Sequence, residues 1–263
     1  MDQATSVIEL RQYLQHWKDH GQSIALIPTM GNLHAGHMSL IEKGQSLCDR
    51  SICSIFVNPM QFGPNEDFNH YPRTLDSDIA QLEASGCDLV YLPTASELYP
   101  DGLDKISNVQ VTDLTDSYEG AHRPGHFTGV LTVVMKLLNL VRPQRAYFGK
   151  KDYQQYLLVR DMAETFFMDV EIVGCETVRE CDGLAMSSRN KLLPADARRI
   201  ASKFNRALRS PACDKEVGDA LANFGFQVDY IETQGPRRFG AIIVDCGDRT
   251  VRLIDNVEVS EVA

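Results

Sequence analysis

The stretch Ser23-Ile-Ala-Leu-Ile-Pro-Thr-Met-Gly-Asn-Leu-His-Ala-Gly-His37 joins a short apolar run to a turn that contains glycine. The apolar run over residues 23–28 predicts a buried strand, and the residues after the turn predict a helix that continues to about Asp49. Gly31 and Gly36 permit a close approach of the backbone, and the unpaired N–H groups at a helix start attract an anion. The stretch therefore predicts a strand, a phosphate-binding turn and a helix.

His34 and His37 lie three positions apart, so they share one face of a helical turn. Two imidazoles beside a helix N-terminus suit a polyphosphate whose negative charge grows as it leaves. A tight turn with two surface histidines is the other interpretation. A zinc site is disfavoured, because two histidines without a third nearby ligand leave a tetrahedron incomplete.

Apolar runs and helical stretches alternate outward from this point. Further strands are expected at residues 51–57, 88–92, 145–148 and 170–173, with helices at 74–85, 127–141 and 153–167. Thr74 is expected to cap the first of these helices, with Asp76 and Asp78 in its first turn and Gly86 as its stop. This alternation predicts right-handed βαβ units and a parallel sheet. The expected fold class is α/β, with a Rossmann-like domain over residues 1–175.

The pattern changes after about Glu176. One basic helix over residues 194–209 and a second short helix precede strands at 226–233, 241–246 and 250–255. We therefore expect a smaller α+β C-terminal lid domain over residues 176–263. Residues 179–209 carry eight Lys and Arg against three Asp and Glu, an excess that suits a polyanionic ligand, although a solvated helix face explains part of it.

Composition limits the classes of function. The chain has 263 residues, 26 Lys and Arg against 36 Asp and Glu, and a formal charge of −10, which disfavours nucleic acid as a partner. No window approaches the roughly 18 apolar residues of a membrane span, and the first residues lack a signal-peptide pattern. Seven cysteines without a C-x-x-C pair argue against a disulfide framework or a structural zinc site. We expect a cytoplasmic protein.

Two further loops follow predicted strands, where ligands bind on parallel sheets. In residues 56–63, Asn58 and Gln61 lie among apolar side chains, which suits a small polar ligand with an apolar body. A buried loop whose amides satisfy local backbone is an equally good interpretation. In residues 148–155, Lys151 offers a cation for phosphate, Asp152 a partner for a ribose hydroxyl or a helix cap, and one of two glutamines can face a ligand.

A fourth loop, residues 182–190, lies near the expected domain junction. Ser187, Ser188 and Arg189 form a compact group of donors for phosphate oxygens, and a junction loop can close over a nucleotide. A plain linker is the other interpretation. Arg123, in residues 119–127, is a candidate partner for a substrate carboxylate, whereas His122 and His126 are more typical of solvent-facing or structural histidines.

Six motifs in order carry a resemblance to a known family. They are P-T-M-G-N-L-H-A-G-H (28–37), F-V-N-P-M-Q-F (56–62), Y-P-R-T (71–74), R-P-G-H-F-T-G-V (123–130), F-G-K-K-D-Y-Q-Q (148–155) and D-G-L-A-M-S-S-R-N (182–190). The series resembles the pantoate–β-alanine ligase (pantothenate synthetase) family, within the H-x-G-H nucleotidyl-transferase superfamily. That resemblance implies a two-step reaction: pantoate and Mg-ATP form pantoyl adenylate and pyrophosphate, and β-alanine then displaces AMP to form pantothenate.

The resemblance also implies residue roles. His37 matches the proton donor, and His34, Lys151 and Arg189 complete the expected catalytic set. Gln61 and Gln155 would hold pantoate, with Gln61 also near β-alanine, and Asn58 and Arg123 join them as substrate-binding candidates. The expected ATP-binding residues are Met30, Gly31, Asn32, Leu33, His34, Ala35, Gly36, His37, Gly149, Lys150, Lys151, Asp152, Val178, Met186, Ser187, Ser188 and Arg189. Position 150 is usually acidic in this motif, so only a backbone contact is carried over to Lys150.

The resemblance further implies Mg²⁺ that enters with ATP as substrate, no dedicated metal site, no tightly bound organic cofactor, and a homodimer without nucleic acid or membrane partners. Two rival functions remain open at the level of the residues. One is a related nucleotidyltransferase that only transfers AMP to a phosphate ester, which would need more cations than the neutral pair Gln61 and Gln155 supplies. The other is a non-catalytic nucleotide-binding module, in which the phosphate ligands would tend to be lost.

Overall fold

The computed structural model of this protein describes residues 1–64, 66–111, 117–247 and 249–259. They group into two compact units, of which the first comprises Met1–Lys150 and Gln154–Cys175. The second comprises Lys151–Tyr153 and Glu176–Ala263, so three residues of the 148–155 motif group with the C-terminal part of the chain. Each unit has its own hydrophobic core and is described by itself.

The first unit is built on a parallel sheet. Within the described residues the sheet has six strands in the order β1-β4-β3-β2-β5-β6. The strands are β1 (Asp2–Ala4), β2 (Ile24–Thr29), β3 (Arg50–Ile55), β4 (Leu89–Tyr91), β5 (Arg145–Gly149) and β6 (Glu171–Cys175). The predicted parallel α/β fold is confirmed, and β2 to β6 correspond to the five predicted strands. β1 escaped prediction because three residues are too few to show a periodicity.

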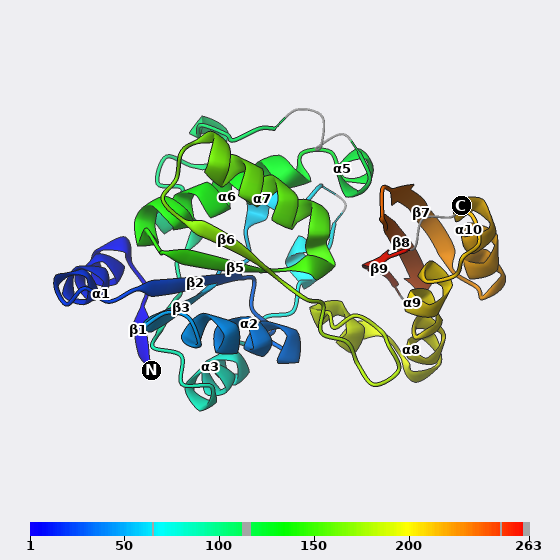
Figure 1. The fold of residues 1–263 in the computed structure, drawn as a ribbon, viewed down its shortest axis with the longest axis horizontal. Coiled ribbons are helices and arrows are strands. Elements are labelled where there is room, and N and C mark those ends of the chain that lie inside the picture. The colour runs from blue at the N-terminus through cyan, green and yellow to red at the C-terminus, as the bar shows by residue number, and fades with distance from the viewer. Residues whose placement is uncertain (65, 112–116, 248, 260–263) are drawn as a thin grey trace. The chain divides into compact units, whose positions relative to one another are not determined.

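Helices cover both faces of this sheet (Figure 1). The helices are α1 (Val7–Asp19), α2 (Ala35–Gln45), α3 (Leu75–Ala84), α4 (Ala95–Leu98), α5 (Glu119–His122), α6 (His126–Val141) and α7 (Tyr153–Thr165). Figure 1 shows α6 and α7 on one face and α2 and α3 on the other. Every helix predicted in this part of the chain is present, but α2 ends at Gln45, because the hydroxyl of Ser46 bonds back to the Lys43 carbonyl at 2.7 Å.

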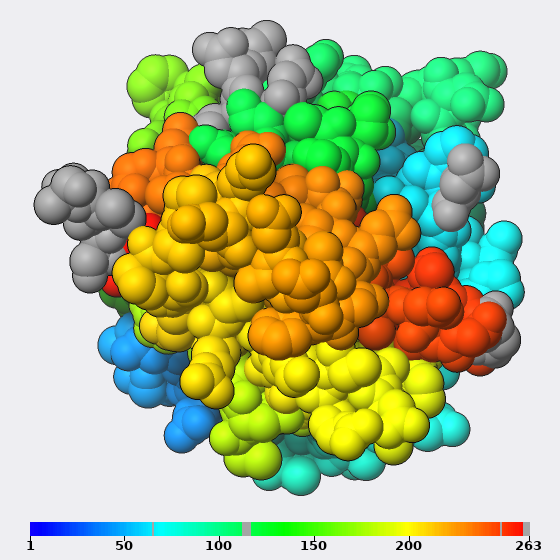
Figure 2. Space-filling view, turned by 90° about the vertical axis from the view of Figure 1, so that its right-hand side faces the viewer, coloured from blue at the N-terminus to red at the C-terminus, as the bar shows by residue number. Residues whose placement is uncertain are grey.

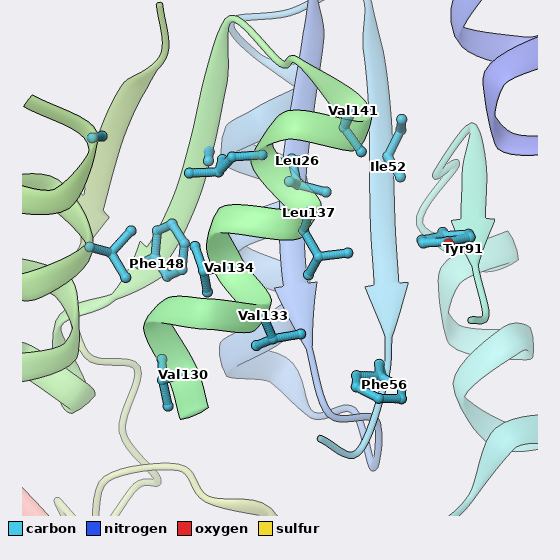
Figure 3. Packing of buried hydrophobic residues seen from close by; sticks show 14 of the residues in the cluster. Leu26, Ile52, Phe56, Tyr91, Val130, Val133, Val134, Leu137, Val141 and Phe148 are labelled. Atoms are coloured by element: carbon cyan, nitrogen blue, oxygen red, sulfur yellow. The ribbon is translucent and has the colours of Figure 1, made fainter. Parts of the chain in front are cut away.

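Side-chain alternation along the strands explains the two layers. In β2, Leu26 points into the core under α6, whereas Ala25 and Ile27 belong to the core under α2 and α3. Figure 3 shows the first of these cores, where Val133, Val134 and Leu137 of α6 pack against Leu26 and its neighbours. Each such side chain contributes about 1.5–3 kcal/mol on full burial. Helix α6 ends at Val141, and Arg142, its C-cap, lies in the left-handed region at φ 49° immediately before Pro143.

One predicted helix cap is wrong. Thr74 does precede α3, and Gly86 follows its end with φ 74°, but the Thr74 side chain makes no capping bond. Its hydroxyl instead donates to Asp78 Oδ1 at 3.1 Å and lies 3.4 Å from Asn32 Oδ1. The Thr74 hydroxyl therefore serves as a donor to Asp78 and does not accept from the amides of the first turn of α3.

The second unit packs helices on an antiparallel sheet. Within the described residues this sheet is β7-β8-β9, formed by Gln227–Gln234, Arg237–Asp245 and Thr250–Glu258. The helices are α8 (Ala195–Ala201), α9 (Lys203–Leu208) and α10 (Asp214–Asn223). Figure 2 shows these helices, coloured yellow to orange, side by side on the surface of the unit. The predicted α+β class is confirmed, but the single basic helix expected over 194–209 is interrupted at Ser202, whose hydroxyl donates to the Arg199 carbonyl at 2.7 Å.

Two further sequence expectations concern membrane spans and cysteines. No helix in the described part of the chain is long and apolar enough to cross a bilayer. The seven cysteines, all in described segments, are free thiols. Burial raises the pKa of the Cys87 thiol, which is typical of an inert core cysteine.

Candidate active site

The turn over residues 28–37, called the histidine loop below, has a specific backbone shape. Gly31 and Asn32 follow β2 with φ of 78° and 48°, in the left-handed region. A Cβ on Gly31 would lie 3.0 Å from both Asp78 Oδ2 and Ile55 Cγ2, so position 31 requires glycine for both conformation and space. The Thr29 hydroxyl donates to the Ser54 carbonyl at 2.8 Å and accepts from Gly31 N at 3.2 Å, which ties the loop to β3.

The two histidines of the loop form a reciprocal cap on α2. His34 Nδ1 accepts from Gly36 N at 3.1 Å, and His37 Nδ1 accepts from His34 N at 3.3 Å. The ring centroids are 4.1 Å apart. Because Nδ1 accepts in both rings, each neutral imidazole carries its proton on Nε2. The pair therefore offers two Nε2–H donors at the positive end of a helix, the arrangement that suits a phosphate.

Gln61 is held beside the histidine loop. It ends the short 3-10 helix η1 (Pro59–Gln61), is 8% exposed, and its Nε2 lies 3.1 Å from Met30 Sδ. Asn58 Nδ2 donates to Gln61 Oε1 and to the Gly129 carbonyl, each at 3.1 Å. The amide orientation of Gln61 is thus set by Asn58 and does not rotate freely.

Asn58 itself is 1% exposed and fully engaged within the protein. Its Oδ1 accepts from Met60 N at 3.3 Å and from the Tyr99 hydroxyl at 2.9 Å, in addition to the two bonds that its Nδ2 donates. Both amide hydrogens and both acceptor positions are used. Direct contact of Asn58 with a substrate stays a prediction, and the geometry supports a role in positioning Gln61.

Arg123 contacts two carboxylates of the protein. Its Nε donates to Glu66 Oε1 at 2.9 Å, a second nitrogen pairs with Glu66 Oε2, and a third bonds Glu119 Oε1 at 3.2 Å. The guanidinium also lies 3.0 Å from His126 Nε2 and 3.5 Å from the Gln61 carbonyl. In this arrangement Arg123 contacts His126 and the carbonyl of Gln61. The predicted contact of Arg123 with a substrate carboxylate is not tested and stays a prediction.

His126 completes this network from the start of α6. Its Nδ1 lies 2.8 Å from the Gln61 carbonyl oxygen, which can only accept, so Nδ1 carries the proton and Nε2 accepts from Arg123. Burial, followed by the charge of Arg123, lowers the pKa of His126 from 6.5 to about 4. The structural interpretation of His126 made from the sequence matches this geometry.

The 148–155 motif divides between the two units. In the first unit, Gly149 ends β5. Gln154 is buried, and its Nε2 donates to the Ser117 carbonyl at 2.8 Å. Gln155, next to it on α7, is partly exposed. Only one of the two glutamines is therefore accessible to a ligand, and it is Gln155. In the second unit, Lys151 Nζ lies 3.7 Å from Asp152 Oδ1, and Asn256 Nδ2 donates to the Lys151 carbonyl at 2.8 Å.

The 182–190 loop is held by a polar network in the second unit. Arg198 bonds Glu180 Oε2 at 2.8 Å and Asp182 Oδ2 at 2.6 Å, and Asn190 Nδ2 donates to Glu180 Oε1 at 2.8 Å. Met186 N donates to the Val178 carbonyl at 3.0 Å, so the predicted residues Val178 and 186–189 lie on one compact turn. Part of the positive excess in residues 179–209 is therefore neutralised within the protein.

Ser187 caps the next short helix, η6 (Ser188–Leu192), and accepts from Arg189 N at 3.3 Å. The turn is anchored further by Arg179, whose guanidinium forms two bonds with Asp255 at 2.7 and 2.9 Å and donates to the Gly183 carbonyl at 3.1 Å. The Asp255 side chain is 0% exposed and also accepts from Asn205 Nδ2 at 2.9 Å. A buried, fully bonded ion pair therefore fixes the base of this loop.

Three contributors to the site escaped sequence analysis. Asp78 was assigned to a helix first turn, yet its buried carboxylate bonds the histidine loop. Gly129 lets α6 approach η1 so closely that a Cβ there would lie 2.3 Å from the Met60 carbonyl oxygen. Tyr99 reaches Asn58 from beyond α4. Of the three, only Gly129 gave a signal in the sequence. A glycine inside an apolar helix reduces the stability of that helix, so its presence indicates that another element packs closely against it.

Comparisons with known proteins agree with the resemblance. The family model described as pantoate-beta-alanine ligase matches residues 2–258. A pantothenate synthetase of Shewanella amazonensis is 48% identical over 242 residues, covering 88% of this chain and 86% of the relative. One of Coxiella burnetii is 49% identical over 236 residues, covering 89% of each chain.

Solved structures give the same result. Pantothenate synthetase from Thermus thermophilus matches with a TM-score of 0.86 at 40% identity, covering 98% of this chain and 99% of that one. Pantoate-beta-alanine ligase from Francisella tularensis, solved in complex with beta-gamma ATP and beta-alanine, matches with a TM-score of 0.88 at 38% identity, covering 98% and 97%. On these matches, this chain belongs to the pantoate–β-alanine ligase family.

Proposed function

We propose that this chain joins pantoate to β-alanine at the expense of ATP and releases pantothenate, AMP and pyrophosphate. Family membership over residues 2–258 supports this proposal. The observation that carries it is local: the Nδ1 atoms of His34 and His37 cap α2, which leaves the ring protons on Nε2, and the oriented amide of Gln61 lies against Met30 of the same loop. Phosphate donors and a neutral group for a hydroxy acid thus occur together in the first unit.

The first step forms a mixed anhydride. A carboxylate oxygen of pantoate attacks the α-phosphorus of ATP, the bond to the bridging oxygen of pyrophosphate breaks, and negative charge collects on the leaving group. His34 and His37 meet that charge with Nε2–H donors, and His37 is the proton donor to the departing phosphate. A single preorganised donor of this kind contributes roughly 10²–10³-fold in rate.

The second step forms the amide. The neutral amine of β-alanine attacks the acyl carbon of pantoyl adenylate, the carbon–oxygen bond to AMP breaks, and the nitrogen releases a proton to solvent. AMP is a much better leaving group than the oxygen of a free carboxylate. Gln61 and Gln155 hold pantoate, and Gln61 also orients β-alanine, so the protein contributes chiefly through alignment.

By family analogy we propose further ATP-binding residues: Met30, Gly31, Asn32, Leu33, Ala35, Gly36, Gly149, Lys150, Asp152, Val178, Met186, Ser187 and Ser188. Lys151 and Arg189 supply positive charge to the phosphates. We propose that Mg²⁺ arrives with ATP as part of the substrate, and within the described residues no group of three or more His, Cys, Asp or Glu could hold a metal ion.

We propose positioning roles for Asn58 and Arg123, because the protein itself engages the hydrogen-bonding groups of Asn58 and pairs the guanidinium of Arg123. Direct contact with pantoate is the alternative. Family analogy also supports a cytoplasmic homodimer. Light scattering on the purified protein measures the oligomer, and a monomer at micromolar concentration would contradict the dimer.

The experiment measures AMP and pyrophosphate release from Mg-ATP with pantoate and β-alanine together, and with each omitted. We expect release to require pantoate, and pantothenate to form only with both. His37→Ala should reduce pantoate-dependent ATP–pyrophosphate exchange by roughly 10²–10³-fold, whereas His70→Ala, on the exposed side of η2 (Phe68–His70), should leave it unchanged. A product that retains AMP would favour a nucleotidyltransferase, and ATP binding without exchange a regulatory module.

A further inference from the structure

Asp78 lies inside the first unit and bonds the histidine loop through its backbone. The side chain comes from the first turns of α3 (Leu75–Ala84), and the residue is 1% exposed. Oδ2 accepts from Asn32 N and Oδ1 accepts from Leu33 N, each at 2.8 Å. The Thr74 hydroxyl adds a third bond to Oδ1 at 3.1 Å. Both carboxylate oxygens are therefore committed to holding this loop.

The loop needs such an acceptor because its backbone is in an uncommon conformation. Gly31 and Asn32 are consecutive residues in the left-handed region, and this conformation turns the N–H groups of Asn32 and Leu33 toward α3. Left-handed backbone is unfavourable for residues other than glycine unless the surroundings determine it. One carboxylate that binds both amides provides that constraint, and it does so immediately before the two histidines.

A general electrostatic role for Asp78 does not explain this geometry. Asp76, two residues earlier on the same helix, is exposed and is placed to interact with the helix dipole. Within the described segments no lysine, arginine or histidine pairs with Asp78. Burying an ionised carboxylate is costly, and the main-chain amides of the loop are what offsets that cost.

We propose that Asp78 is a positioning residue for ATP: it holds residues 30–33 in the shape that places His34, His37 and the start of α2 against the phosphates. It touches no substrate and acts through the main chain of Asn32 and Leu33. This inference rests on the proposed function, since it assigns ATP to the histidine loop. It goes beyond that function by tying phosphate binding to a side chain on a different helix.

The test compares Asp78→Asn with Asp76→Asn. Asparagine keeps the size of aspartate but replaces one acceptor oxygen with a donor, so one of the two loop amides faces an N–H group. We expect Asp78→Asn to raise the KM for ATP by roughly 10- to 100-fold, the effect of losing one charged hydrogen bond and misdirecting a second. The KM values for pantoate and β-alanine should change less than about 3-fold, and Asp76→Asn should match the wild type.

Amide hydrogen exchange without ligand supplies a readout that does not depend on catalysis. Asp78→Asn should accelerate exchange in peptides covering residues 30–37 and leave peptides covering residues 56–62 unchanged. Trp17, the only tryptophan of the chain, is buried in the first unit and reports by fluorescence whether that unit is folded. If Asp78→Asn does not fold, Thr74→Val removes the hydroxyl that lies 3.1 Å from Asp78 Oδ1 and 3.4 Å from Asn32 Oδ1, keeps the carboxylate, and should raise the KM for ATP about 3- to 5-fold.

Each outcome is decisive. If the wild-type protein shows no pantoate-dependent ATP–pyrophosphate exchange, the proposed function is wrong. Amide hydrogen exchange in residues 30–37 then still tests whether Asp78 holds the loop. If the wild type is active and Asp78→Asn has an unchanged KM for ATP, the positioning role is wrong. If Asp78→Asn is unfolded, an unchanged KM for ATP in Thr74→Val has the same meaning. Restoration of Asp78→Asn by excess Mg²⁺ would also overturn the positioning role, because the carboxylate would then act on the metal and not on the loop.

Discussion

The Nδ1 atom of His126 lies 2.8 Å from the main-chain carbonyl oxygen of Gln61, and this bond joins the start of α6 to η1. Burial and the adjacent Arg123 guanidinium lower the pKa of His126 to about 4. The imidazole therefore remains neutral in the folded protein at pH values where the unfolded chain, with a pKa near 6.5, takes up a proton. This difference makes the stability of the first unit depend on pH.

Because the folded pKa is the lower one, the stabilisation is fully present above about pH 6.5 and is lost as the pH falls toward about 4. We expect this group alone to reduce the free energy of unfolding by about 2 kcal/mol between pH 7 and pH 5. Urea unfolding followed by Trp17 fluorescence measures it. His126→Asn, which keeps an N–H donor but does not titrate, should lose about 2 kcal/mol less over that range. Equal pH dependence in wild type and variant would refute the assignment, and His70→Asn serves as the control.

Gly129→Ala should damage the site through packing. The added methyl group would lie 2.3 Å from the Met60 carbonyl oxygen and 2.7 Å from Gln61 N, so α6 or η1 must shift. We expect a loss of about 1–3 kcal/mol in the free energy of unfolding, typical of overpacking, together with reduced turnover. Gly218→Ala in α10 is the matched control, since no atom lies within 4 Å of the position that its methyl group would take. Thermal unfolding should show no loss there, and a gain of up to about 1 kcal/mol.

Asn58→Asp should impair use of pantoate more than use of ATP. The new carboxylate oxygen would face Gln61 Oε1 and the Gly129 carbonyl, both acceptors, so the amide of Gln61 loses its orientation. We expect kcat/KM for pantoate to fall by roughly 10- to 100-fold. Asn139→Asp, on the exposed side of α6, is the control and should retain wild-type rates. Initial rates against each substrate separate the effects, and an equal loss for ATP would contradict the prediction.

Arg179→Ala should destabilise the second unit. It leaves the Asp255 carboxylate, 0% exposed, with bonds from Asn205 Nδ2 and Asn256 N but without the Arg179 guanidinium. Breaking a buried pair in this way costs about 3–5 kcal/mol. Arg199→Ala removes an ion pair whose side chains are 78% and 90% exposed, and it should change stability by less than about 0.5 kcal/mol. Hydrogen exchange in β9 peptides measures the difference, and equal protection in both variants would be inconsistent with it.

Local patterns in the sequence allowed the α/β class, five of the six strands of the parallel sheet, and the three strands of the C-terminal unit to be predicted. Strands such as β2 are apolar on both faces, and α6 ends where Arg142 meets Pro143, so their signals are local. The break at Ser202 was missed because a serine inside a helical pattern has no fixed effect: its hydroxyl must find the carbonyl of Arg199. β1 is defined by pairing with β4, a contact between distant residues.

The sequence alone determined which functional groups the loops carry. It showed which loops follow strands, which residues carry imidazole, amide, ammonium and guanidinium groups, and which family motifs they form. It was enough because strand and helix periodicity and turn residues act over a few positions. Local capping bonds orient His34 and His37, whereas the orientation of the Gln61 amide and the backbone shape of the histidine loop came from tertiary contacts. Asp78, His126 and Gly129 act on loops 45 to 71 residues away, and such partners are chosen by packing and by the need to satisfy buried polar groups.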